Sequence, residues 1–220
     1  DNFVKDTVKA CLGDVVEAEA TFAEPNIFTS FAAQTSADPA YMPLPVGETG
    51  MEVLSRTLAD KLDEYNSTNS IMNLVLFKQA MQHVCRISRI IYNPGGNAML
   101  VGVGGSGKQS LSRLAAFICG YTVSQITISA TYSINDLKED LKTMYGRAGL
   151  KDEGVMFLFT DSQITNERFL VYINDLLASG FIPDLYADDE IDEICNAVTP
   201  RVKEAGIIPD RKPCFDFFLQ

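Results

Sequence analysis

The spacing of apolar positions predicts helices in the first half of the chain. Apolar side chains recur every three or four positions over residues 51–65 and 75–92, as expected for helices with one buried face. The tetrapeptide NPGG ends the second helix, because proline cannot continue it and glycine permits a turn. A further helix is expected within residues 3–20. Residues 23–50 contain four prolines and predict an extended connector.

Three short apolar runs alternate with helical patterns in the second half. AMLVGV, QITISA and VMFLFTD are typical of buried parallel strands, at residues 98–103, 125–130 and 155–161. Ser133 and Asp136 predict a capping box at the start of a following helix. The expected helices cover residues 108–119, 134–145, 166–178 and 188–204, and a last one begins near Asp210. This alternation predicts βαβ units, and hence an α/β fold with a parallel sheet.

A glycine-rich loop, GVGGSGK, lies between the first apolar run and the next helix at residues 102–108. It matches the pattern G-x-x-x-x-G-K of phosphate-binding loops. Its glycines let the backbone curl with amides pointing inward, and the positive end of the helix adds to this cradle. Lys108 adds a charge toward the β- and γ-phosphates. The residues predicted to bind nucleotide are Val103, Gly104, Gly105, Ser106, Gly107, Lys108, Gln109 and Ser110. The competing interpretation is a glycine-rich turn with an incidental lysine.

The residues expected to support hydrolysis depart from the pattern at two positions. Gln109 stands where a serine or threonine hydroxyl would bind magnesium, and Ser110 is a poor substitute because one helical residue rotates the side chain by about 100°. Asp161 ends the third apolar run and is the predicted magnesium ligand. The next residue is Ser162. Proteins that hydrolyse a nucleotide at such a loop carry a glutamate at this position, which orients the attacking water. Losing such a base lowers the rate by about 10²–10⁴-fold.

Composition excludes several other kinds of function. The net charge of −11 opposes nucleic-acid binding through a basic surface. No segment approaches the roughly 20 apolar residues that span a bilayer, so no membrane partner is expected. The five cysteines form no CxxC pair and the chain has one histidine, which predicts free thiols and excludes a zinc site.

Several segments resemble one known family. GVGGSGKQSLSRLAAFI and FLFTDSQITNERFLVYINDLLASGFIPDLYADDEIDEI together resemble the fourth AAA+ module of dynein heavy chains. The Lys-Gln-Ser loop and the Asp-Ser pair are similar to axonemal dyneins, whereas cytoplasmic relatives tend to carry Lys-Thr and Asp-Glu. MNLVLFKQAMQHVCRISRII resembles the segment before the loop in the same module. The resemblance covers residues 40–220, and residues 1–40 resemble, more weakly, the join from the preceding module.

The resemblance implies a P-loop NTPase (AAA+) fold of three layers around a parallel sheet with strand order 5-1-4-3-2. The chain supplies strands 1–3 only, and the fourth belongs between the first and third, so we expect these residues to be part of a longer protein. Residues 1–50 would be a connector, residues 51–92 the N-terminal helices, and residues 93–220 a partial large subdomain.

The resemblance also implies a function. The whole protein would be a microtubule motor of cilia and flagella, located in the cytoplasm and the axoneme, with principal hydrolysis in its first module. This module would bind ATP or ADP, with or without Mg²⁺, in a regulatory or structural role. Met72, Leu74 and Val75 would cover the adenine, although core packing also explains them. Partners would be the adjacent AAA+ modules and, through the full protein, the microtubule and the dynein intermediate and light chains.

Two alternatives remain open at this point. An active ATPase would need another carboxylate as its base, and Glu167 and Asp188 are the candidates. An interaction scaffold would have an empty site.

Overall fold

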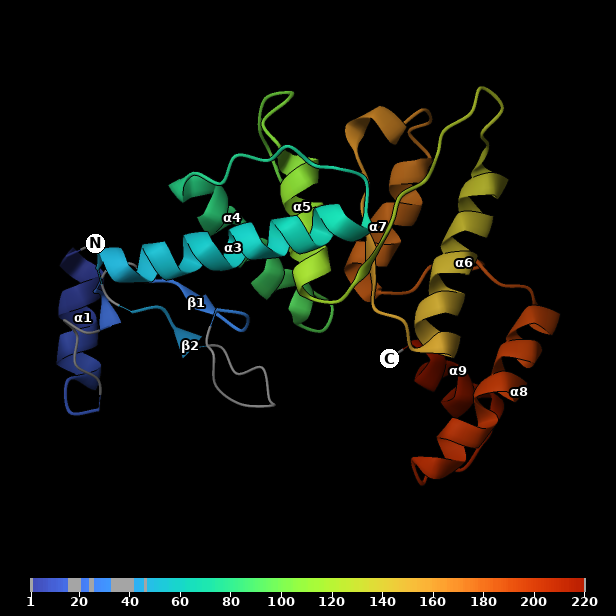
Figure 1. The fold of residues 1–220 in the computed structure, drawn as a ribbon. Coiled ribbons are helices and arrows are strands. Elements are labelled where there is room, and N and C mark those ends of the chain that lie inside the picture. The colour runs from blue at the N-terminus through green and yellow to red at the C-terminus, as the bar shows by residue number, and fades with distance from the viewer. Residues whose placement is uncertain (1, 16–20, 24–25, 33–41, 46, 220) are drawn as a thin grey trace. The chain divides into compact units, whose positions relative to one another are not determined.

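A computed structural model describes residues 2–15, 21–23, 26–32, 42–45 and 47–219 (Figure 1). The chain divides into two compact units, each with its own core. The first consists of Asp1–Asn93 with Ala98–Cys119, and the second of Pro94–Asn97 with Gly120–Gln220.

The first unit is mostly helical. Its elements are α1 (Asn2–Leu12), β1 (Phe28–Thr29), β2 (Met42–Pro43), α3 (Glu48–Thr68), α4 (Lys78–Tyr92) and α5 (Lys108–Ile118). β1 and β2 form a small antiparallel pair in the segment that the sequence predicted to be a connector. The helices at residues 51–65, 75–92 and 108–119 are confirmed, with ends displaced by a few residues. Part of the helix expected within residues 3–20 falls on residues 16–20, which lie outside the described residues.

The core of the first unit lies among α3, α4 and α5. Leu54 and Leu58 of α3, Val84 of α4 and Leu114 of α5 have no exposed surface. Burial of each such side chain contributes about 1.5–3 kcal/mol to stability. This packing holds α5, whose first residue is Lys108, against the two other helices.

The second unit contains a βαβ arrangement followed by further helices. Its elements are β3 (Thr122–Ser124), α6 (Ile134–Lys151), β4 (Val155–Phe157), the 3-10 helix η1 (Asp161–Gln163), α7 (Phe169–Ser179), α8 (Asp188–Glu204) and α9 (Arg211–Leu219). β3 and β4 pair in parallel, with Val123 opposite Met156. The predicted capping box of Ser133 and Asp136 is confirmed at the start of α6.

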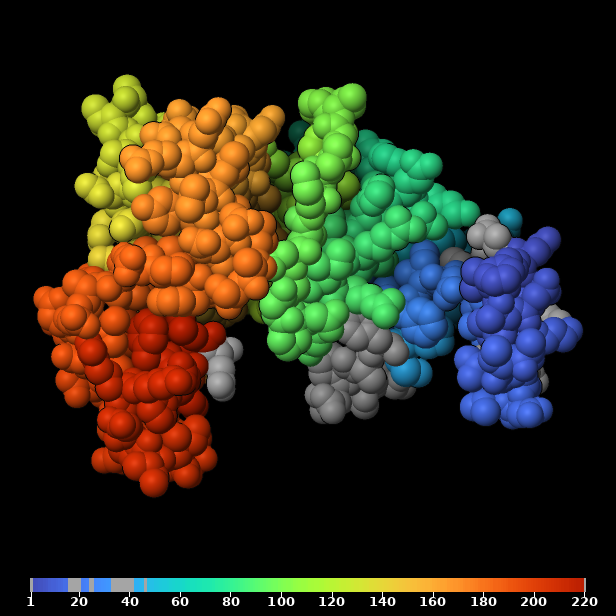
Figure 2. Space-filling model, turned by 180° about the vertical axis from the view of Figure 1, so that it is seen from behind, coloured from blue at the N-terminus to red at the C-terminus, as the bar shows by residue number. Residues whose placement is uncertain are grey.

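Two clusters of buried side chains hold the second unit together. Leu137 and Leu141 of α6 pack with Phe169 and Ile182 beside the strands. A second cluster joins α8 to α9 and includes Val198 and Val202 of α8 and Phe218 of α9. The two helices lie against each other in Figures 1 and 2. Sulfur does not bridge these helices, since Cys195 and Cys214 are both free.

The predicted strands are only partly confirmed. Residues 125–130 are not a strand; β3 lies three residues earlier, where its backbone pairs with β4. The third run forms a strand only at Val155–Phe157, although the amide of Leu158 extends the ladder to the carbonyl of Ser124 at 2.8 Å.

The prediction of a buried strand at residues 98–103 is wrong for this structure. The side chains of Met99, Val101 and Val103 are 91%, 85% and 79% exposed. A strand obtains its hydrogen bonds from a neighbouring strand. None of the described residues pairs with this segment, so its apolar character alone does not make it a strand.

Candidate functional site

The glycine-rich loop leads directly into α5. Gly105 and Gly107 adopt φ values of 75° and 76°, a left-handed conformation that favours glycine. A side chain at Gly102 would meet the Ser106 hydroxyl at 3.3 Å. The glycines at these positions therefore permit the tight turn that the sequence predicted.

Several backbone amides of the loop have no acceptor among the described residues. The first amide of α5 with an acceptor in its own turn is Leu111, which donates to the Gly107 carbonyl at 2.8 Å. Within the described part of the chain, the amides of Gly104, Gly105 and Gly107 have no recorded acceptor, nor do those of residues 108–110. A run of free amides at a helix N-terminus suits phosphate oxygens, because the helix dipole adds a partial positive charge there.

Lys108 lies across this loop. Its ammonium donates to the carbonyls of Gly102 and Val103 at 2.6 and 2.8 Å, and to the Ser106 hydroxyl at 3.3 Å. Gln109 is exposed, and Ser110 is partly buried one position further along the helix. The structure thus brings together the predicted loop residues and their lysine.

Of the apolar residues before the loop, Met72 and Leu74 are packed against other side chains, whereas Val75 is exposed. The Leu74 side chain lies beside the loop, with its Cδ1 atom 3.7 Å from where a side chain would begin at Gly107. Leu74 and Met72 also pack against the core of the first unit, and the Met72 amide donates to Asn66 at 2.7 Å. Val75 is 77% exposed. Core packing and contact with the loop therefore coexist at Leu74.

Asp161 and Ser162 belong to the second unit. Both are exposed in η1, just after β4. The Ser162 hydroxyl lies 3.0 Å from that of Thr160, and the Thr160 amide donates to Gln163 at 2.8 Å. The side chain of Gln163 is buried and donates to the Ile126 carbonyl. Sequence reasoning missed this anchoring role because a polar residue after a strand carries no distinguishing pattern.

Comparison with known proteins decides the family. Residues 72–220 match a family model described as "P-loop containing dynein motor region D4". The chain belongs to this dynein family. Membership implies a P-loop NTPase fold, and it confirms the resemblance to the fourth module of dynein heavy chains.

Relatives of this dynein region come from axonemal heavy chains. The chain is 55% identical over 90% of its length to "Dynein alpha chain, flagellar outer arm" of Chlamydomonas reinhardtii. It is 52% identical over 95% of its length to human "Dynein axonemal heavy chain 17", and 53% identical over 93% to "Dynein beta chain, ciliary" of Tripneustes gratilla. The matched region is about 4% of the length of each relative.

The described residues of this dynein region contain neither a metal-binding cluster nor a membrane-spanning helix. Among the described residues, no group of three or more His, Cys, Asp or Glu side chains is arranged to hold a metal ion. No helix in the part of the chain that the structure describes is long and apolar enough to cross a membrane.

Proposed function

We propose that this chain is a nucleotide-binding AAA+ module of a ciliary or flagellar dynein heavy chain, and that it holds ATP or ADP with little or no hydrolysis. The observation that carries the proposal is the loop at the start of α5. It combines backbone amides that have no acceptor among the described residues with two left-handed glycines and an ammonium group at one helix N-terminus. Family membership and the names of the relatives support the part of the proposal that concerns a P-loop region of a dynein heavy chain.

The residues present fit a nucleotide. Residues 103–110 would hold the phosphates, and Leu74, with Met72 and Val75, would lie on the side of the base. In this proposal Asp161 would bind Mg²⁺, a cation that prefers carboxylate oxygens. Of these residues, the structure places Leu74 beside the loop.

The proposed slow turnover rests on Gln109 and Ser162. Glutamine replaces the hydroxyl ligand of the ion, and serine replaces a carboxylate that would orient water. Neither alternative base is favoured by its contacts: Asp188 accepts a hydrogen bond from Arg211 at 2.7 Å, and Glu167 is exposed.

The wider role is part of the same proposal. The connector at residues 1–50, the helices at 51–92 and the partial large subdomain at 93–220 would form one module. The module would contact adjacent AAA+ modules. Through the full heavy chain it would act with intermediate and light chains on microtubules in the axoneme.

Titration of the chain with fluorescent ATP and ADP tests the proposal. Replacing Lys108 with alanine removes a charge-assisted contact, so we expect the affinity to fall about 10–100-fold. Lys151→Ala is the matched control, because this exposed lysine ends α6 and belongs to the other unit. Circular dichroism checks that both variants fold.

Two results would contradict the proposal. Unchanged affinity in Lys108→Ala would show that the loop does not hold the phosphates. Absence of binding by the folded parent chain would favour the interaction scaffold.

A further inference from the structure

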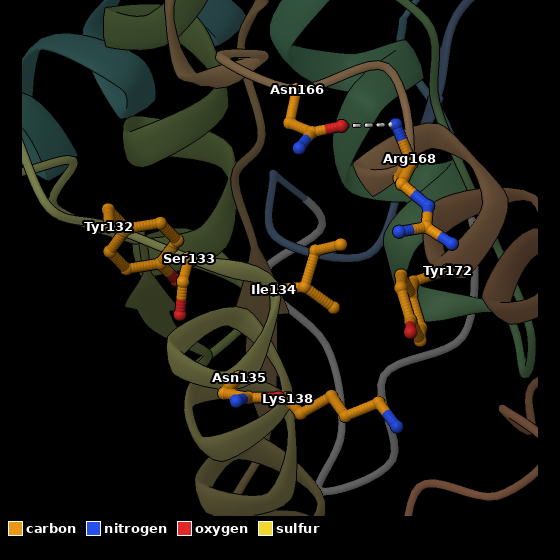
Figure 3. A pocket seen from close by; sticks show the side chains of 8 residues that line it. All are labelled: Tyr132, Ser133, Ile134, Asn135, Lys138, Asn166, Arg168 and Tyr172. Atoms are coloured by element: carbon orange, nitrogen blue, oxygen red, sulfur yellow. Dashed lines mark hydrogen bonds between the residues drawn. The ribbon is translucent and has the colours of Figure 1, made fainter.

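A second candidate binding site lies in the second unit, where α6 and α7 begin (Figure 3). It is a groove of about 620 Å³, within the size range of ligand sites. The residues that line it come from two segments, 132–138 and 166–172. The lining residues form no recognisable sequence motif, so the groove could not be predicted from the sequence.

The groove carries positive charge in an acidic protein. Of its eight lining residues, Lys138 and Arg168 are the charged ones, whereas the whole chain has a net charge of −11. Two nearby carboxylates of α6 have partners of their own. Asp136 accepts from the amide and hydroxyl of Ser133 at 2.7 Å, and Asp140 accepts from the Tyr132 hydroxyl. The lining therefore selects for an anionic ligand.

The two cations flank an aromatic ring. The Lys138 ammonium lies 5.6 Å from the centre of the Tyr172 ring and donates to the Asp184 carbonyl at 3.3 Å. Figure 3 shows Arg168, Tyr172 and Lys138 following one another along one side of the groove, with Ile134 near its centre. The charged groups are thus separated by apolar surface instead of converging on one point.

The basic groups retain unused donors. The Arg168 backbone amide donates to Asn166 at 2.9 Å, but its guanidinium has no recorded acceptor within the described residues. A guanidinium offers five N–H groups in a fixed fork that fits a carboxylate, and an ammonium offers three. The N-terminus of α6 adds a partial positive charge beside them.

This arrangement favours a peptide over a small anion. Phosphate sites of the loop type use backbone amides that converge on one ion. Here the donors are side chains on either side of Tyr172, and both Arg168 and Asn166 are exposed, so the groove is open. Acidic side chains joined to methylene stems can reach spaced cations while their stems cover Tyr172 and Ile134.

We propose that this groove docks an acidic segment of a partner protein, whose carboxylates bind Arg168 and Lys138. The inference does not depend on nucleotide binding at residues 103–110. It assigns the start of α7 a recognition role and explains why the lining of the groove holds two basic side chains and no carboxylate.

Fluorescence anisotropy with a short labelled peptide of alternating glutamate and serine tests this proposal on the whole chain. The paired variant Lys138→Ala with Arg168→Ala should weaken binding by at least about tenfold, since it removes two charged hydrogen-bond donors. Binding to the parent chain should also weaken as salt rises. Lys151→Ala together with Lys212→Ala removes the same charge elsewhere and should leave affinity unchanged.

Other outcomes would overturn the proposal. If the control pair weakened binding as much as the paired variant, the attraction would be unspecific. If a glutamine–serine peptide bound as tightly as the glutamate–serine peptide, the groove would not recognise carboxylates. Displacement of the peptide by inorganic pyrophosphate at matched charge would identify a small-anion site instead. Self-association of the chain that the paired variant abolishes would identify a second copy as the occupant. A circular dichroism melt shows whether the paired variant is folded. The single substitution Arg168→Gln, which removes one charge and keeps a polar side chain, should also weaken binding.

Discussion

At the scale of single residues, two glycines of α6 have opposite surroundings. A side chain at Gly146 would meet nothing within 4 Å. A side chain at Gly149 would lie 2.5 Å from the Phe218 ring and 2.6 Å from the Phe218 carbonyl oxygen. Gly149 is therefore the position at which α6 and α9 can approach closely.

Alanine substitutions at these two positions should change stability in opposite directions. Gly146→Ala should stabilise the protein by about 0.5–1 kcal/mol, because alanine loses less backbone entropy in a helix. Gly149→Ala should destabilise it by about 1–3 kcal/mol through overpacking against Phe218. Urea unfolding measures both free energies. Equal effects of the two substitutions would show that α9 does not contact α6 at this point.

At the scale of elements, an ion pair joins α6 to α8. The Lys142 ammonium lies 2.6 Å from the Glu190 carboxylate. The hydrogen bond from Lys142 and a second one from the Ala187 amide lower the pKa of Glu190 below its ordinary value of 4.5. A carboxylate with a lowered pKa contributes stability above its ordinary pKa, and that contribution disappears as pH falls through the pKa of the folded state.

Replacing Glu190 with glutamine should therefore cost stability at pH 7, and this cost should shrink progressively as the pH falls from 7 to 3. We expect a difference of at most about 1 kcal/mol, because water screens a partly exposed pair. Unfolding measured across this pH range tests the window, with the exposed Glu193→Gln on the same helix as control. A difference that persists at low pH would contradict the role of the ion pair.

The sequence predicted helices better than strands, for a physical reason. A helix satisfies its own backbone, so local signals such as the capping box of Ser133 and Asp136 were enough to locate α6. A strand depends on a distant partner, and residues 98–103 and 125–130 were placed on composition alone. The glycine-rich loop was predictable because its residues are contiguous in the sequence. The basic groove was not, since Lys138 and Arg168 are thirty residues apart by numbering and only packing joins their segments.

At the scale of the whole molecule, the chain is a small region of its relatives. It matches about 4% of the length of each axonemal heavy chain compared above. Its loop and its Asp161–Ser162 pair belong to different units. Turnover is therefore a property to be measured in the complete heavy chain.

The combined change Gln109→Thr with Ser162→Glu should raise turnover at this module by about 10²-fold or more, because it restores a hydroxyl ligand and a base. Single-turnover hydrolysis in a full heavy chain, with its first module silenced, measures this rate. Glu167→Gln is the control. Fast hydrolysis by the unmodified module that is lost in Glu167→Gln would show instead that this glutamate is the base.

The exposure of residues 98–103 has a consequence for handling the protein. Met99, Val101 and Val103 present apolar side chains on a segment whose backbone has no strand partner among the described residues. Unpaired apolar segments of this kind template edge-to-edge association between copies. When this chain is produced by itself, residues 98–101 are therefore the first place to introduce a solubilising charge, because a change there leaves the loop at 102–108 unaltered.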